Sequence, residues 1–146
     1  MKRIVVGIDG SDESIKALRW AIDEAQLRAA TVEAVCAWTY PYAAGDGFGT
    51  MAVAFDPKDL AAGAASTLET AIAAACPDPA LRATIKRRIV EDRPAHALIT
   101  ESDGAELLVV GSRGHGSFAG LLLGSVSLHV VTHCKCPVVV IRSTGE

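Results

Sequence analysis

Short apolar runs recur along the chain and predict five β-strands. They are rich in Val and Ile, which is typical of strands in a parallel sheet because both faces of such strands are covered. The runs occupy residues 2–8, 31–37, 83–90, 107–110 and 137–141. In the third run apolar residues alternate with Lys and Arg, which indicates a strand at the edge of the sheet.

Segments with apolar residues at helical spacing lie between these runs and predict four helices. They cover residues 12–29, 58–75, 94–101 and 125–133. Ser11 or Asp12 is suited to cap the first helix, because a short polar side chain accepts hydrogen bonds from the free amides of the first turn. The sequence that starts at Cys76, Cys-Pro-Asp-Pro, ends the second helix, since proline has no amide hydrogen to continue it.

Strands and helices alternate along the chain, which predicts an α/β fold. We expect one doubly wound, mostly parallel five-stranded sheet of the Rossmann-like type. Right-handed crossovers favour the strand order 3-2-1-4-5, in which the first and fourth strands are neighbours. Residues 1–146 contain no internal repeat or linker and are expected to form a single domain. Ligands of such sheets bind at the carboxyl ends of the strands where the order reverses, here near Asp9 and Gly111.

The composition argues against several classes of function. The chain has 146 residues, 50% of them hydrophobic, and a net charge of -3 without a basic block, so we expect no nucleic-acid partner. Its apolar stretches are interrupted well before the roughly 18 residues that a membrane span requires. The N-terminal apolar run is too short for a signal peptide. These features predict a cytoplasmic protein with no membrane partner.

The cysteines near the C-terminal end raise the question of a metal site. Cys134 and Cys136 lie close in sequence to His129 and His133, which are one helical turn apart. Zinc sites use a Cys-x-x-Cys-like pair together with a second ligand pair, and the sequence offers neither. Free thiols at an ordinary helix end are therefore the favoured interpretation.

A glycine-rich stretch connects the fourth predicted strand to the last helix. Its characteristic residues are Gly111, Gly114, Gly116, Gly124 and Ser125. A strand, a glycine loop and a helix N-terminus together form an anion site, because free backbone amides and the positive end of the helix dipole converge there. Arg113 is placed to add a guanidinium to this point and Ser125 to add a hydroxyl. We interpret the stretch as a phosphate site.

This stretch is neither a P-loop, which requires a Lys-Ser or Lys-Thr pair, nor a dinucleotide fingerprint, which follows the first strand. The spacing Gly111-x-x-Gly114, then nine residues, then Gly124-Ser125 resembles the phosphate motif of the ATP-binding branch of the universal stress protein family. The resemblance extends over nearly the whole chain. It implies ATP, ADP or AMP as the ligand, and a homodimer formed through the last strand, residues 137–141.

The expected contacts with an adenine nucleotide come from several parts of the chain. The loop amides from Ser112 to Gly116 would hold the phosphates together with the helix start at Gly124, Ser125 and Val126. Asp9 would bind the ribose or, through water, a Mg²⁺ ion on the phosphates. The Ala37 backbone would read the adenine edge. The resemblance also implies that Gly7 belongs to the site, at the end of the first strand.

Three functional hypotheses follow from the sequence. The first is a nucleotide-binding regulatory protein of the stress response, in which ATP shifts a conformational or oligomeric equilibrium and hydrolysis is slow or absent. The second is an adenylating enzyme that releases pyrophosphate, although residues 7–14 lack the double glycine of that class. The third is a nucleotide-free interaction module that uses the aromatic stretch 38–57. That stretch would otherwise cover a base or fill the sheet edge.

Overall fold

The computed structural model describes residues 1–40, 56–114 and 123–142. Its centre is a five-stranded sheet in the order β3-β2-β1-β4-β5, and every neighbouring pair of strands is parallel. The strands are β1 (Arg3–Gly7), β2 (Thr31–Trp38), β3 (Lys86–Glu91), β4 (Leu107–Gly111) and β5 (Val138–Ile141). The predicted fold class and strand order are confirmed.

Five helices occur in the described residues, one more than the sequence predicted. They are α1 (Asp12–Arg28), α3 (Pro57–Ala75), α4 (Pro79–Arg82), α5 (Pro94–Glu101) and α6 (Ser125–His133). The additional helix is α4, which begins inside the proline-containing sequence that ends α3. Asp78 caps it by accepting a hydrogen bond from the Ala80 amide at 3.0 Å, and Pro79 provides the first residue, where its missing amide hydrogen costs nothing.

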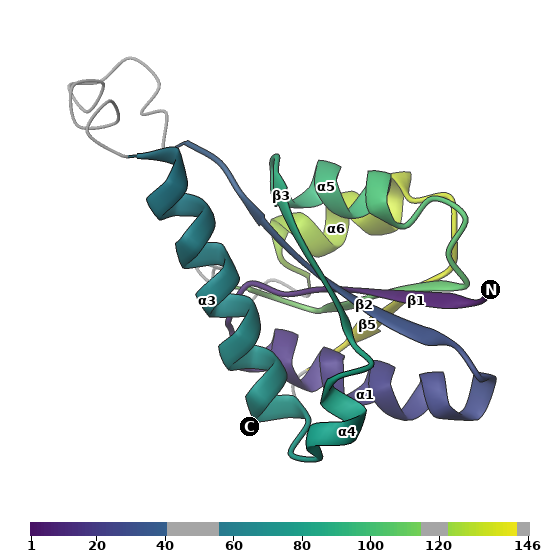
Figure 1. Ribbon diagram of the computed structural model, residues 1–146. Helices are drawn as coiled ribbons and strands as arrows, with labels where there is room; N and C mark the ends of the chain where they lie inside the picture. Colours follow the sequence, from purple (N-terminus) through teal and green to yellow (C-terminus); the bar gives the residue numbers. More distant parts are fainter. Residues whose placement is uncertain (41–55, 115–122, 143–146) are drawn as a thin grey trace.

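The helices form two layers, with α1 and α3 on one face of the sheet and α5 and α6 on the other (Figure 1). Side chains of β1 alternate between these layers, because successive residues of a strand point to opposite faces. Ile4 and Val6 pack with α1 and α3, whereas Val5 packs with α5 and α6. Apolar cover on both faces explains why the central strands β1 and β4 are continuous apolar runs in the sequence.

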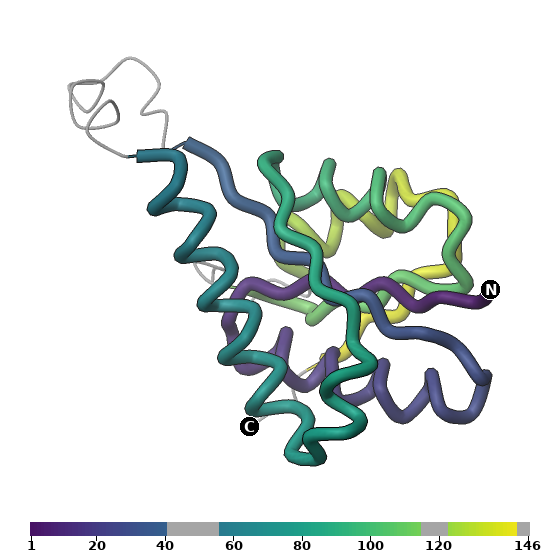
Figure 2. The backbone as a smooth tube through the Cα atoms, in the orientation of Figure 1, coloured from purple at the N-terminus to yellow at the C-terminus, as the bar shows by residue number. Residues whose placement is uncertain are grey.

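Strands β1 and β4 lie side by side although about a hundred residues separate them in the sequence (Figure 2). Their register pairs Ile4 with Leu107 and Val6 with Val109. The residues that follow each strand are therefore brought together at one edge of the sheet. Among the described residues, no helix is long and apolar enough to cross a membrane.

Two leucines of α1 allow a matched test of the core. Leu18 is 0% exposed between α1 and the sheet, whereas Leu27 is 83% exposed. We expect Leu18→Ala to lower the free energy of unfolding by about 2–5 kcal/mol, because it leaves a cavity in the core. Leu27→Ala should change it by less than about 0.5 kcal/mol. Urea titrations followed by circular dichroism measure both; similar losses in the two variants would contradict this packing.

Candidate functional site

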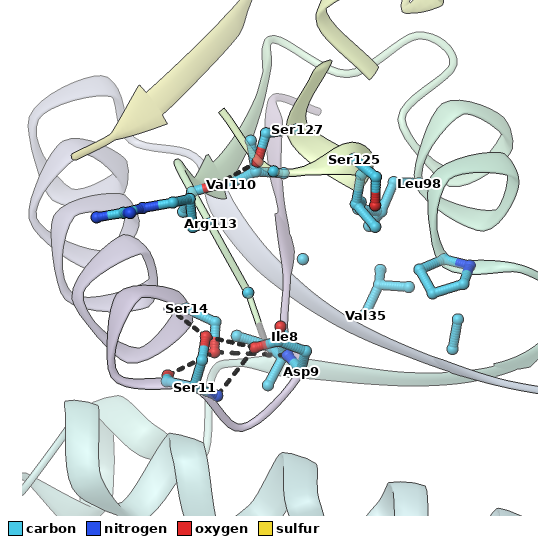
Figure 3. Close-up of a pocket in the computed structure, with 17 residues that line it drawn as sticks. Ile8, Asp9, Ser11, Ser14, Val35, Leu98, Val110, Arg113, Ser125 and Ser127 are labelled. Atoms are coloured by element: carbon cyan, nitrogen blue, oxygen red, sulfur yellow. Dashed lines mark hydrogen bonds between the residues drawn. The ribbon is translucent and has the colours of Figure 1, made fainter. Parts of the chain in front are cut away.

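A cavity of about 270 Å³ opens at the carboxyl ends of β1, β2 and β4 (Figure 3). It is lined by Gly7, Ile8, Asp9, Ser11, Ser14, Val35, Ala37, Pro94, Leu98, Val110, Gly111, Arg113, Gly114, Gly124, Ser125, Val126 and Ser127. Figure 3 shows a polar side formed by Asp9 and Ser11, and Val35 and Leu98 on the other side. The topology places this cavity where the strand order reverses, at the position expected for a ligand.

Most of the residues predicted to bind a ligand line this one cavity. They are Gly7, Asp9, Ala37, Gly111, Arg113, Gly114, Gly124, Ser125 and Val126. Gly116 lies outside the described residues. Ser112 is described, but it is not among the lining residues.

Ser112 connects the sheet to α6 instead of facing the cavity. Ser112 is 3% exposed to solvent, and its amide donates a hydrogen bond to the Ile141 carbonyl at 2.8 Å. Its own carbonyl accepts from the Gly124 amide at 2.6 Å. This corrects the sequence-based assignment: the Ser112 amide is already donated to β5, so it has no hydrogen left for a phosphate.

Glu13, in the first turn of α1, binds the loop that follows β4. Its Oε1 accepts hydrogen bonds from Ser112 Oγ at 2.6 Å and from the Arg113 amide at 2.8 Å. Its Oε2 lies 4.0 Å from Arg113 Nε, and in Figure 3 the Arg113 side chain extends away from Val35 and Leu98. A carboxylate of the protein thus accepts a hydrogen bond from a loop amide that the sequence assigned to a phosphate, and lies at ion-pair distance from the guanidinium.

The glycines of the site are required where neighbouring elements approach closely. A Cβ atom on Gly111 would lie 2.8 Å from Glu13 Cβ and 3.0 Å from its carbonyl carbon. A Cβ on Gly7 would lie 2.7 Å from Leu98 Cδ1, and one on Gly114 would overlap the Asp9 carboxylate. Only at Gly111 is the neighbour a rigid part of a helix; at Gly7 and Gly114 it is the end of a side chain, which can move.

Asp9 stabilises the turn between β1 and α1. Its Oδ1 accepts hydrogen bonds from the Ser11 amide at 2.9 Å and from Ser11 Oγ at 2.5 Å (Figure 3). Burial raises the pKa of the Cys36 thiol on β2, and the negative charge of Asp9 raises this pKa further. Asp9 therefore both shapes the turn and gives one wall of the cavity a negative potential.

The N-terminus of α6 contributes polar groups to the opposite side. Gly124 is its N-cap residue, in an extended conformation, and has no side chain that could accept from the amides of the first turn. Ser127 Oγ donates to the Gly111 carbonyl at 2.5 Å and so fixes α6 against the end of β4. Sequence reasoning did not identify Ser127, nor Val35, Pro94 and Leu98 on the apolar wall, because only the topology brings them to the cavity.

Comparison with known proteins agrees with this architecture. The sequence model of the universal stress protein family matches residues 1–142. The chain belongs to this family.

Two universal stress proteins of Mycobacterium tuberculosis are related to this member of the family at 38% identity over 143 residues and 34% identity over 144 residues. Both alignments include 97% of this chain but 45% of the relative, so the chain spans about half the length of the curated relatives it matches.

The structure of UspA from Lactobacillus plantarum has a TM-score of 0.78 at 24% identity, with 97% of both chains covered. A universal stress protein in complex with cAMP has a TM-score of 0.61 at 31% identity, with 98% of both chains covered.

The cysteine pair near the C-terminal end lies outside the cavity of this universal stress protein. Cys134 Sγ is 3.5 Å from Cys136 Sγ and 3.3 Å from Ser102 Oγ. Burial, followed by the hydrogen bond with Cys134, raises the pKa of Cys136 to about 11, which disfavours a reactive thiolate. Nowhere in the ranges that the structure describes do three or more His, Cys, Asp or Glu side chains form a group that could hold a metal ion.

The aromatic stretch is described only at its start. Trp38 and Tyr40 are in edge-to-face contact, with ring centroids 6.1 Å apart. The other aromatic residues of the stretch, Tyr42, Phe48 and Phe55, lie outside the described residues.

The close approach of Gly111 to α1 can be tested with a matched glycine in an open position. A Cβ on Gly111 meets the backbone of Glu13, whereas a Cβ on Gly63 in α3 has no other atom within 4 Å. We expect Gly111→Ala to lower the free energy of unfolding by about 1–3 kcal/mol through overpacking. Gly63→Ala should raise it by up to about 1 kcal/mol through better helix propensity. Denaturant titration of both variants is the measurement, and a Gly111→Ala variant as stable as the unchanged protein would disprove the steric role.

Proposed function

We propose that this protein binds an adenine nucleotide in the cavity at the ends of β1 and β4. The observation that carries the proposal is the convergence of the glycine loop, the α6 N-terminus and Asp9 on one cavity with an apolar opposite wall. Helix N-termini with free amides favour anions such as phosphate, and apolar walls favour a base. The structure in complex with cAMP, at 31% identity, supports an adenine nucleotide as the ligand class.

Each part of the nucleotide has a suitable partner in this proposal. The phosphates lie at Gly114 and at the first turn of α6, where Ser125 and Val126 offer backbone amides. The base lies against Val35 and Leu98, with the Ala37 backbone at its edge. The ribose lies next to Asp9.

In this proposal a Mg²⁺ ion that accompanies the phosphates would be held by Asp9 through water. Mg²⁺ prefers oxygen ligands and is usually held by one or two carboxylates together with the phosphates of a substrate. Asp9 provides a carboxylate on the cavity wall. Bound there with ATP, the ion would neutralise phosphate charge close to the acidic side of the cavity.

We propose a regulatory role and at most slow ATP hydrolysis. Rapid phosphoryl transfer requires cationic groups on the transferred phosphate. Among the described residues of the cavity wall, the one basic side chain is Arg113, and it is paired with Glu13. The bound nucleotide then acts by stabilising one conformation or assembly over another, as in a stress-response switch. A cytoplasmic location stays a prediction, consistent with four free cysteines.

The proposed assembly is a homodimer through β5. This strand occupies one edge of the sheet, and its four residues, Val138 to Ile141, are all apolar and only partly buried. An apolar edge strand favours pairing with another chain, because its outer backbone groups and side chains are otherwise left to solvent.

Replacement of Ser125 by Glu tests the nucleotide proposal. A carboxylate in the first turn of α6 suits the helix dipole, so the fold should persist, while its charge repels phosphate. We expect the Kd for ATP, measured by isothermal titration calorimetry with Mg²⁺, to rise at least about tenfold.

Ala62→Glu is the matched control, since it adds the same charge at an exposed position of α3 away from the cavity. Its Kd should equal that of the unchanged protein. If the unchanged protein binds neither ATP, ADP nor AMP, and carries none when denatured as purified, the nucleotide proposal is wrong.

A further inference from the structure

An ion pair between α1 and the loop after β4 stands directly beside the cavity. Its partners are Glu13 and Arg113, whose Oε2 and Nε atoms are 4.0 Å apart, and the Glu13 side chain is 15% exposed. The same carboxylate accepts from Ser112 Oγ and from the Arg113 amide. Because this carboxylate is only 15% exposed, solvent ions screen it incompletely and its charge acts on groups within several ångströms.

The charges around the cavity are unusual for a site that would bind several phosphates. Arg113 is the one basic residue among the described residues of the wall, and Asp9 is the one acidic residue. Glu13 lies at ion-pair distance from Arg113, whose side chain extends away from Val35 and Leu98 (Figure 3). The described part of the site therefore has a negative balance once Asp9 and Glu13 are counted together.

We propose that Glu13 is a specificity-determining residue that limits how much phosphate charge the site accepts. The inference rests on the proposed nucleotide function and refines it. The Glu13 carboxylate repels each additional negative charge on a ligand. Because Arg113 is paired with Glu13, its guanidinium also attracts each of these charges less strongly. The consequence is a bias toward nucleotides with one phosphate over those with three.

The alternative is that Glu13 only fixes the loop. The two hydrogen bonds to the loop would serve that purpose for any ligand. A tether of this kind changes the affinities for AMP and ATP by the same factor, because both ligands use the same loop. A charge changes the ratio of the two affinities, since ATP carries more negative charge than AMP. The ratio therefore separates the two roles.

The experiment measures the Kd values for ATP and AMP by isothermal titration calorimetry in EDTA, without divalent ions. In Glu13→Gln we expect the ratio of the ATP Kd to the AMP Kd to fall on the order of tenfold, because the charge is removed while the shape is retained. Addition of Mg²⁺ should shrink this effect, since the ion neutralises part of the ATP charge.

Two further variants serve as controls. Glu13→Asp keeps the charge but shortens the tether, so its ratio should stay near that of the unchanged protein even if both affinities fall. Glu24→Gln removes a carboxylate of the same helix that pairs with Arg28 at 3.1 Å, and it should leave both affinities unchanged. Circular dichroism confirms that each variant is folded before titration.

An unchanged ratio in Glu13→Gln, or the same shift in Glu13→Asp, overturns the specificity role and leaves Glu13 as a tether. That result is distinct from failure of the nucleotide function, in which the unchanged protein binds neither ligand. In the latter case both proposals are wrong.

Discussion

The contact between the first turn of α1 and the end of β4 is the constraint on which the site depends. At Gly111 the strand passes so close to α1 that an added Cβ atom would lie only 2.8 Å from the Cβ of Glu13 and 3.0 Å from its carbonyl carbon. The proximity lets the Glu13 carboxylate reach the Ser112 hydroxyl and the Arg113 amide. These two hydrogen bonds anchor the loop after β4 on α1.

The site combines two opposite electrostatic tendencies. The N-terminus of α6 attracts anions, because its first amides point out of the helix and Gly124 offers no side chain to receive them. Asp9 places a carboxylate on the far side of the same cavity. A ligand with an anionic end and hydroxyl groups elsewhere satisfies both sides, since hydroxyls can donate to the carboxylate while the anion faces the helix.

Much of this architecture could be predicted from the sequence, and the exceptions have physical causes. Apolar runs and helical spacing predicted the elements, and right-handed crossovers predicted the strand order, which brings Asp9 and Gly111 to one cavity. Helix α4 was missed because proline ends one helix and equally begins another. The loop anchor at Glu13 was missed because an acidic residue in a first turn suits the helix dipole in any context. Its partner, 99 residues away, is visible only once the fold is known.

Ser112 connects the edge strand β5 to the helix α6, and the sequence alone does not reveal this connection. Its amide donates a hydrogen bond to the carbonyl of Ile141, the last residue of β5. Its carbonyl accepts a hydrogen bond from the amide of Gly124, the N-cap of α6. One buried residue thus joins the outer edge of the sheet to the helix that faces the cavity. The end of β5 at the rim of the sheet and the N-cap of α6 at the cavity are therefore connected through two hydrogen bonds of the same residue.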